Sequence, residues 1–331
     1  MLPSIRNHGG LVAEFSPRGA SLQRFLVPDG QGGQTNLVMS PADALAPRSA
    51  CAYAGAIVSP TAGRVRKGLI RWGDAQAQLD INEAPHHLHG GAHGLSDVMW
   101  ELEEYQEDAL TFTISLADGL GGYPGNRNFR VSYRLTDDNE LQLDISANSD
   151  LPTWFNPTSH IYWNLSGDCR EGLDTHTLQV NADQVYRNRE DHTLASLMPV
   201  DGSIFDLRES RQMGSMLEDK TNRQVLWARG LNHLFALSSS AKGTAQLILS
   251  HPTSGRNLRV ETTLPGIWLY SGGFLNSNLQ LADGQIAAPN LALAIEPQIG
   301  PGVLDLEWEG VSIPITKHYM HNISFRFENL Q

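Results

Sequence analysis

The chain has 331 residues, of which 40% are hydrophobic and 18% are charged, with 31 glycines and 17 prolines. This composition is typical of a turn-rich globular protein and argues against a disordered chain. The formal net charge of −12 argues against a nucleic-acid partner, because phosphate backbones are bound mainly through lysine and arginine. Since all-β domains often reach about 200–250 residues or more, we expect one domain over residues 1–331.

Cysteine content and targeting signals indicate a reducing compartment. Cys51 and Cys169 are too few for a disulfide framework and are not spaced as a metal-binding knuckle. The N-terminal residues lack a basic region followed by an apolar run, and no stretch approaches the roughly 18 apolar residues that span a membrane. We therefore expect a cytoplasmic protein without a membrane partner, either a monomer or a homodimer.

Alternation of apolar and polar residues is the dominant pattern along the chain, and it predicts half-buried strands. Pro252 to Gly255 supply a turn between two of these stretches, which indicates a hairpin. In chain order the stretches are residues 110–116, 129–135, 141–147, 178–182, 247–249, 258–262 and 319–327.

Helical patterns are few and short. Residues 41–46 and 208–217 are the best candidates, and neither sustains a 3.6-residue period beyond about three turns. Residues 26–47 and 187–211 are expected to be long loops that shape a binding face. The predicted fold is all-β: a large antiparallel β-sandwich of many strands with few short helices.

The stretch from Trp154 to Gly167 gathers hydrogen-bonding groups and aromatic rings around His160. Asparagine and threonine can bind sugar hydroxyls, aromatic rings can lie against the C–H face of a pyranose, and histidine titrates near neutral pH. The pattern is therefore typical of one wall of a sugar site. A buried, hydrogen-bonded core histidine is the alternative.

Glu296 lies inside the apolar run from Leu293 to Gln298. A carboxylate in such a run is at least partly desolvated unless it is paired, which raises its pKa and makes it a candidate base. The alternative is a carboxylate at a strand end, paired with a surface arginine.

Residues 86–94 contain four histidines. The spacing of His87, His89 and His93 resembles the ligand histidines of a cupin-type metal site. In a cupin a carboxylate normally follows the first two histidines by a few residues. Here the fourth residue after His89 is His93, so that carboxylate is absent. We therefore expect neither a metal nor another cofactor, and we expect His86, His87 and His93 to be loop residues without a catalytic role.

The motifs, taken in order, resemble the aldose 1-epimerase, or galactose mutarotase, family. Each motif is weak alone, but they occur in the family's order between about residues 55 and 327. They are Gly63-Arg64; residues 88–94 with Trp100; residues 156–160 with Tyr162 and residues 164–165; residues 200–206; residues 230–233; residues 254–256; residues 265–266 with residues 269–270; and Glu296 with Gln298.

This resemblance implies a supersandwich fold and an enzyme that interconverts the α and β anomers of a free aldose by ring opening and closure. It implies that Glu296 is the base, that His160 is the acid, and that His89 forms a hydrogen bond near the reacting oxygens. It also implies that Arg64 contacts a sugar hydroxyl. For these roles we expect an ionised Glu296 and a protonated His160 in the resting enzyme.

Several positions depart from the family pattern. Asn232 replaces an acid, Trp268 replaces a glutamine, and Arg66 and Lys67 follow Arg64. We expect Arg64, Asn232, Lys67 and Trp268 to bind the substrate. We expect the sugar to be galactose or glucose, or an anionic hexose derivative such as a sulfo- or phospho-sugar. The anionic sugar is suggested because the loss of an acid at Asn232, with Arg66 and Lys67 near Arg64, makes the predicted pocket more positive. The alternative is that Arg66 and Lys67 are solvated loop residues.

Two other functions fit a sugar-binding sandwich. A non-catalytic carbohydrate-binding protein needs the polar and aromatic residues but not the acid–base pair. A glycoside hydrolase normally needs two carboxylates that flank the glycosidic bond. The motif segments offer one carboxylate together with histidines, which disfavours hydrolysis.

Overall fold

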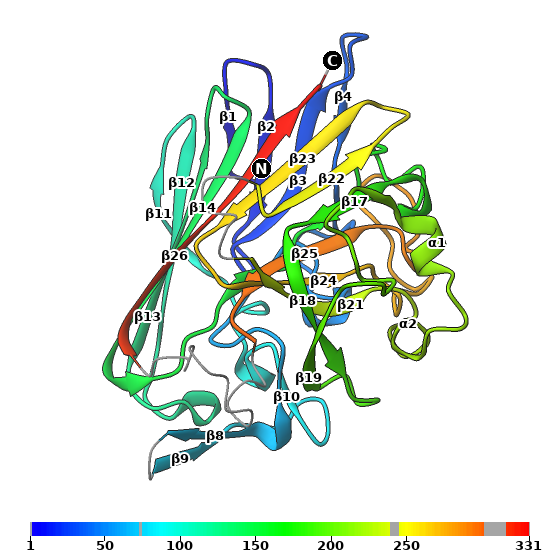
Figure 1. The fold of residues 1–331 in the computed structure, drawn as a ribbon. Coiled ribbons are helices and arrows are strands. Elements are labelled where there is room, and N and C mark those ends of the chain that lie inside the picture. Colours follow the sequence, from blue (N-terminus) through cyan, green and yellow to red (C-terminus); the bar gives the residue numbers. More distant parts are fainter. Residues whose placement is uncertain (1, 73–74, 239–244, 301–315, 331) are drawn as a thin grey trace.

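The computed structural model describes residues 2–72, 75–238, 245–300 and 316–330, and the fold is an antiparallel β-sandwich (Figure 1). Its largest sheet has the strand order β11-β12-β13-β14-β26-β23-β22-β17-β20. The bounds are β11 (Glu101–Tyr105), β12 (Ala109–Leu116), β13 (Arg127–Leu135), β14 (Glu140–Thr153), β26 (Thr316–Glu328), β23 (Arg256–Thr262), β22 (Leu247–His251), β17 (Thr177–Val180) and β20 (Arg211–Gln212).

The second large sheet has the order β19-β18-β21-β24-β25-β16-β5 and carries the candidate site. Its bounds are β19 (Leu194–Pro199), β18 (Ala182–Asn188), β21 (Asn232–Leu237), β24 (Gly266–Tyr270), β25 (Leu293–Gln298), β16 (Tyr162–Trp163) and β5 (Val38–Met39). β25 is buried along its whole length, so both of its faces are covered.

The remaining strands form smaller sheets. Four N-terminal strands pair in order: β1 (Ser4–Arg6), β2 (Val12–Ser16), β3 (Ser21–Pro28) and β4 (Gln34–Asn36). Three two-stranded pairs are β6 (Ile57–Val58) with β15 (Thr158–Ser159), β7 (Arg64–Val65) with β10 (His87–Leu88), and β8 (Leu69–Trp72) with β9 (Ala75–Gln78).

Helices are short in the described part of the chain. They are α1 (Met213–Leu217) and α2 (Arg223–Ala228), together with the 3₁₀ turns Ser49–Cys51, Arg66–Gly68, Gly91–His93, Leu120–Gly122 and Leu173–Thr175. The Asn222 side chain caps α2 by accepting hydrogen bonds from the N–H groups of Gln224 and Val225. In this described part, no helix is both long enough and apolar enough to cross a membrane.

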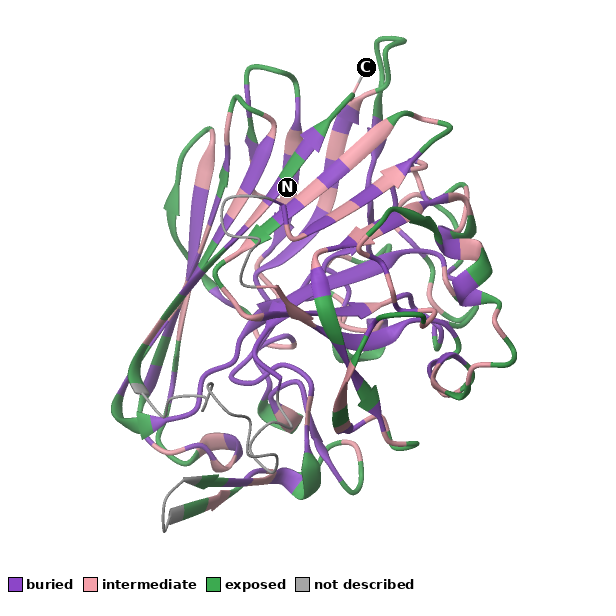
Figure 2. Ribbon diagram, in the orientation of Figure 1, coloured by how far each residue is buried: buried purple, intermediate pink, exposed green. Residues whose placement is uncertain are grey.

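The core lies where the sheets face each other, and Figure 2 shows the buried residues gathered in the centre of the molecule. Phe25 of β3 stacks on Phe327 of β26 with ring centroids 4.4 Å apart. Trp163 of β16 contacts Phe25, Phe325 and Phe327. The N-terminal sheet, the long C-terminal strand and the site-bearing sheet therefore share one core.

The structure confirms the predicted all-β class and most of the predicted strands. The stretches 110–116, 129–135, 141–147, 247–249, 258–262 and 319–327 lie within β12, β13, β14, β22, β23 and β26. The predicted hairpin is β22–β23, which pairs Leu249 with Leu258. The stretch 178–182 is divided at Asn181 between β17 and β18, which belong to different sheets.

Four expectations about irregular segments need correction. Residues 41–46 form turns and bends instead of a helix. In 208–217 only Met213–Leu217 is helical, because the segment begins with an edge strand, β20. Residues 26–47 contain the end of β3 together with β4 and β5, and residues 187–211 contain β19, so neither is one long loop. Pairing with distant strands decides these segments, and local composition does not carry that information.

Candidate active site

Three neighbouring strands of the seven-stranded sheet direct alternate side chains to one face. Trp268 of β24 lies opposite Glu296 of β25, and Tyr270 of β24 lies opposite Asn232 of β21. Because side chains alternate along a strand, the intervening residues Ile267, Leu269 and Ile295 point to the main core instead. The period of two therefore places a carboxyl group, an amide and two aromatic rings on one wall.

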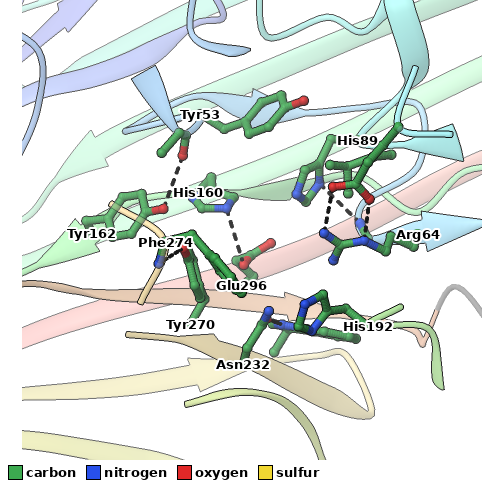
Figure 3. A pocket seen from close by; sticks show the side chains of 15 residues that line it. Tyr53, Arg64, His89, His160, Tyr162, His192, Asn232, Tyr270, Phe274 and Glu296 are labelled. Atoms are coloured by element: carbon green, nitrogen blue, oxygen red, sulfur yellow. Dashed lines mark hydrogen bonds and ion pairs between the residues drawn. The ribbon is translucent and has the colours of Figure 1, made fainter. Parts of the chain in front are cut away.

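A cavity of about 340 Å³ lies against this wall (Figure 3). Its volume is near the lower end of the roughly 300–1,000 Å³ range of small-ligand sites. The lining residues combine aromatic rings with polar groups that converge on one region: Ala52, Tyr53, Gly63, Arg64, Glu83, Leu88, His89, His160, Tyr162, His192, Asn232, Trp268, Tyr270, Phe274 and Glu296.

His160 lies between β15 and β16 in the chain, and backbone hydrogen bonds to Gly55 and Ala56 hold it. Its N–H donates to the Ala56 carbonyl at 2.8 Å, and its carbonyl accepts from the Gly55 N–H at 3.0 Å. The ring is buried, and its Nε2 lies 3.5 Å from Glu296 Oε1. Nδ1 has no hydrogen-bond partner among the described residues. Nε2 is thus the nitrogen through which the ring can exchange a proton with the carboxyl group.

Burial sets the protonation of this pair. It raises the pKa of Glu296 to about 8, opposed by the charge of Arg64 and a hydrogen bond from Gln298. It lowers the pKa of His160 to about 4. The expected ionised Glu296 and protonated His160 are therefore reversed, because desolvation disfavours both charges and leaves the single proton on the carboxyl group.

His89 presents a hydrogen-bond donor to the cavity. Its Nδ1 accepts the Gly63 N–H at 3.2 Å, so in the neutral ring the proton is on Nε2. Burial, with the neighbouring charges of His160 and Arg64, lowers the pKa of His89 well below the usual value. The ring centroids of His89 and His160 are 5.4 Å apart, which places the two imidazoles next to the same space.

Arg64 lines the cavity from β7 and is paired with Glu83. Its Nε and Nη2 lie 2.5 and 2.8 Å from the two oxygens of the Glu83 carboxylate. This bidentate pair fixes the plane of the guanidinium. Only the remaining edge of Arg64 is free to meet a ligand.

Asn232 and Trp268 form a neutral pair on the sheet wall. The Trp268 Nε1–H donates to Asn232 Oδ1 at 2.6 Å, and both side chains are buried. The amide oxygen is thereby occupied, and the Asn232 NH₂ group remains as a donor. Two of the residues that depart from the family pattern thus contact each other.

Comparison with known proteins agrees with this architecture. The family model described as aldose 1-epimerase matches residues 1–302. The chain is 30% identical to galactose mutarotase from Mus musculus, covering 96% of this chain and 95% of that protein. It is also 30% identical to aldose 1-epimerase from Escherichia coli, covering 83% of this chain and 79% of that protein.

Two crystal structures share the fold at full length. An aldose epimerase homologue from C. elegans superimposes with a TM-score of 0.89 at 26% identity, covering 99% of this chain and 98% of the other. Galactose 1-epimerase from Lactobacillus acidophilus gives a TM-score of 0.84 at 26% identity, covering 98% and 93%. The chain belongs to the aldose 1-epimerase family. It is accordingly an enzyme of the isomerase class.

Six of the seven predicted site residues line the cavity, and Lys67 does not. The six are Glu296, His160, His89, Arg64, Asn232 and Trp268. Lys67 and Arg66 are exposed on a 3₁₀ turn and line a separate hollow with Leu69 and Arg71. The sequence predicts that Lys67 binds the substrate, but the structure places Lys67 outside this cavity, with a left-handed backbone (φ 54°) in the turn Arg66–Gly68.

Among the described residues, one set of three could hold a metal ion: His89, His160 and Glu296, with candidate ligand atoms within 4.8 Å of one another. The hydrogen bond from Gly63 opposes this use, because it keeps the proton of His89 on the nitrogen that faces the cavity. The cupin-like combination is not assembled. The His87 nitrogens contact Asp80 and the Tyr123 hydroxyl, and His93 is exposed.

Sequence reasoning missed several lining residues, among them Tyr53, Glu83, His192, Tyr270 and Phe274. Tyr53 and His192 have left-handed backbones (φ 59° and 61°), a property that their residue types do not reveal. Tyr270 carried a usable signal, since it follows Trp268 at the spacing of two that places both side chains on one face of a strand. Glu83 and Phe274 lie in irregular segments with no periodic signal.

Proposed function

We propose that this enzyme interconverts the α and β anomers of a free aldohexose by acid–base catalysis at Glu296 and His160. Galactose and glucose are the neutral candidates, and an anionic hexose derivative is the charged one. The main support is the buried pair itself: an imidazole nitrogen 3.5 Å from a carboxyl oxygen inside a cavity lined with aromatic and hydrogen-bonding residues. Ring opening and closure need one proton acceptor and one proton donor, and this pair supplies both.

In the proposed cycle, the Glu296 carboxylate removes the proton from the C1 hydroxyl while protonated His160 donates to the ring oxygen. The O–H electron pair forms the C1 carbonyl. The electrons of the bond between C1 and the ring oxygen move to that oxygen, which takes the proton from His160 and becomes the C5 hydroxyl. Rotation about the C1–C2 bond presents the other carbonyl face. Closure reverses both transfers and restores the pair, so no net proton is consumed.

Burial favours the ring-opened stage of this cycle. Opening converts a carboxylate and an imidazolium into a carboxylic acid and a neutral imidazole, which is the distribution that burial prefers. The charged pair forms from the neutral one by a proton transfer between Glu296 and His160 across 3.5 Å. Each positioned acid or base contributes about 10²–10⁴ in rate.

We propose that the remaining polar residues orient the sugar. His89 donates from Nε2 to a reacting oxygen without carrying a charge, and Arg64 and Asn232 donate to ring hydroxyls. Trp268 and Tyr270 offer aromatic faces on the sheet wall next to Glu296.

Two alternative functions have less support. A glycoside hydrolase needs a second free carboxyl group. Among the described residues that line the cavity, the other carboxylate is Glu83, and Arg64 binds both of its oxygens. A non-catalytic binding protein has no need for a buried acid–base pair with strongly shifted pKa values. Glu296 and His160 form such a pair, since burial raises the pKa of Glu296 and lowers that of His160.

Anomer exchange measured by NMR tests the proposal. Galactose, glucose and glucose 6-phosphate are each followed with and without catalytic amounts of the protein. We expect exchange of at least one sugar to accelerate in proportion to enzyme concentration. Sugar binding by calorimetry without any acceleration would favour the binding-protein alternative.

We also propose that residues 1–331 form one domain, in the cytoplasm, as a monomer or a homodimer. The family model spans residues 1–302, and the strand that follows, β26, lies between β14 and β23 in the large sheet. The C-terminal strand is therefore part of the same sandwich. Sedimentation would give the oligomeric state directly.

A further inference from the structure

An unpaired arginine stands beside the cavity. Arg229, at the end of α2, has its guanidinium carbon 5.0 Å from the centre of the Phe274 ring, and Phe274 lines the cavity and is 41% exposed. The Arg229 guanidinium has no hydrogen bond or ion pair to any residue that the structure describes. Arg64, by contrast, is held by Glu83.

The backbone fixes Arg229 relative to the cavity rim. Arg229 has a left-handed conformation (φ 53°) and its N–H closes the last turn of α2 on Val225 and Leu226. Gly273 packs directly on this turn, since a Cβ at Gly273 would lie 2.4 Å from the Arg229 carbonyl oxygen and 2.5 Å from that of Ala228. The loop that carries Phe274 and the end of α2 are therefore in close backbone contact.

Two further contacts connect this rim with the catalytic wall. His192 packs edge-on against Phe274 with ring centroids 5.3 Å apart, lines the cavity, and has a buried Nδ1 without a partner among the described residues. The Phe274 N–H donates to the Tyr270 hydroxyl at 3.0 Å, which joins the loop under Arg229 to the catalytic wall. Figure 3 shows Phe274, His192 and Tyr270 around the same pocket.

We propose that Arg229 binds an anionic substituent of the sugar, a phosphate, sulfonate or carboxylate, at the end of the substrate remote from C1. This inference rests on the proposed function. A guanidinium lying over an aromatic ring keeps its N–H groups in one plane, and these match the oxygens of such an anion. A neutral hexose offers Arg229 no comparable partner. The anionic preference expected from Arg66 and Lys67 is thus assigned to a different cation.

Selectivity between charged and neutral sugars tests this assignment. Wild type and Arg229→Gln are compared in anomer exchange on glucose, glucose 6-phosphate and glucuronate, and the ratio of kcat/KM between each anionic sugar and glucose is measured. Losing one charge-assisted contact lowers this ratio by about tenfold or more, mainly through KM. The two anionic arms distinguish a tetrahedral oxyanion from a carboxylate.

The matched control is Arg223→Gln on the same helix. Arg223 is exposed and lies over Trp227 at 5.1 Å, so it has the same kind of cation–π contact away from the cavity. We expect Arg223→Gln to keep the wild-type ratio. Equal efficiency of wild type on neutral and anionic sugars, or an unchanged ratio in Arg229→Gln, would overturn the assignment.

Calorimetry separates this inference from the proposed catalysis. Binding of glucose 6-phosphate to wild type and to Arg229→Gln is measured without turnover, and Arg229→Lys is added as a variant that keeps the charge. We expect tighter binding of the anionic sugar by wild type, weaker binding by Arg229→Gln, and an intermediate affinity for Arg229→Lys. If no sugar exchanges faster while this order holds, the catalytic proposal fails and the anion site stands.

Discussion

The floor and the rim of the cavity are built in different ways. The floor carries Glu296 and His160, both buried; strand pairing holds Glu296, and backbone hydrogen bonds to Gly55 and Ala56 hold His160. The rim carries Glu83, Phe274 and Arg229, which are exposed to a large degree and come from turns and loops. In the proposed mechanism, the floor supplies proton transfer at C1, whereas the rim meets the parts of the sugar that differ between substrates. The proposal therefore assigns reaction and substrate choice to separate elements.

The largest expected effect is at the floor. His160→Gln removes the proton donor and should lower kcat by about 10²–10⁴, while KM changes much less. Polarimetry of freshly dissolved α-glucose or α-galactose measures this rate. His93→Gln, an exposed histidine outside the cavity, is the control and should keep wild-type activity. A variant at His160 with full activity would remove this residue from the mechanism.

The pH profile of kcat/KM tests the shared proton of the floor. The active free enzyme carries one proton on the pair. A second proton binds as pH falls through about 4, the pKa of His160, and the single proton is lost as pH rises through about 8, the pKa of Glu296. We expect a bell-shaped profile with limbs near these values. A profile that is flat from pH 5 to pH 10 would contradict the proposal that Glu296 and His160 share the catalytic proton.

A smaller effect is expected from the rim pair Arg64–Glu83. Glu83→Gln removes the charge that orients Arg64, so KM for a neutral hexose should rise by about tenfold with little change in kcat. The half-exposed position of Glu83 keeps the effect at this level. Steady-state kinetics on glucose give both constants. A fall in kcat with unchanged KM would place Glu83 in the chemistry instead.

The smallest expected effect on activity comes from the neutral pair on the wall. Trp268→Phe removes the indole N–H that donates to the side-chain Oδ1 of Asn232 at 2.6 Å. An unsatisfied buried acceptor costs about 1–3 kcal/mol, so the melting temperature should fall by several degrees. KM should rise only a few-fold. An unchanged melting temperature would show that this hydrogen bond does not contribute to stability.

The same contrast explains how much the sequence could predict. Glu296 and His160 lie in segments with strong local patterns, an apolar strand and a polar–aromatic stretch, so they follow from residue type and motif order, and most strands of the nine-stranded sheet follow from residue periodicity. Arg229 and Glu83 act through contacts with Phe274 and Arg64 that are distant in sequence or lie in irregular segments. Such pairings carry no periodic signal.

The misassignment of Lys67 has a similar physical cause. Its neighbour Arg64 does line the cavity, and sequence proximity predicted the same for Lys67. A left-handed turn three residues further on sends the side chain to a different surface. The protonation of Glu296 and His160 was also beyond local reasoning, because it depends on how completely the fold excludes water from both groups.

The most direct test of the central proposal is anomer exchange by Glu296→Gln. Glu171→Gln is the matched control, because Glu171 is also paired with a histidine, His251 at 3.2 Å, but lies away from the cavity. We predict that Glu296→Gln still binds the sugar and loses about 10²–10⁴ or more of the exchange rate, while Glu171→Gln keeps the wild-type rate. A folded Glu296→Gln enzyme that exchanges anomers at the wild-type rate would contradict the account.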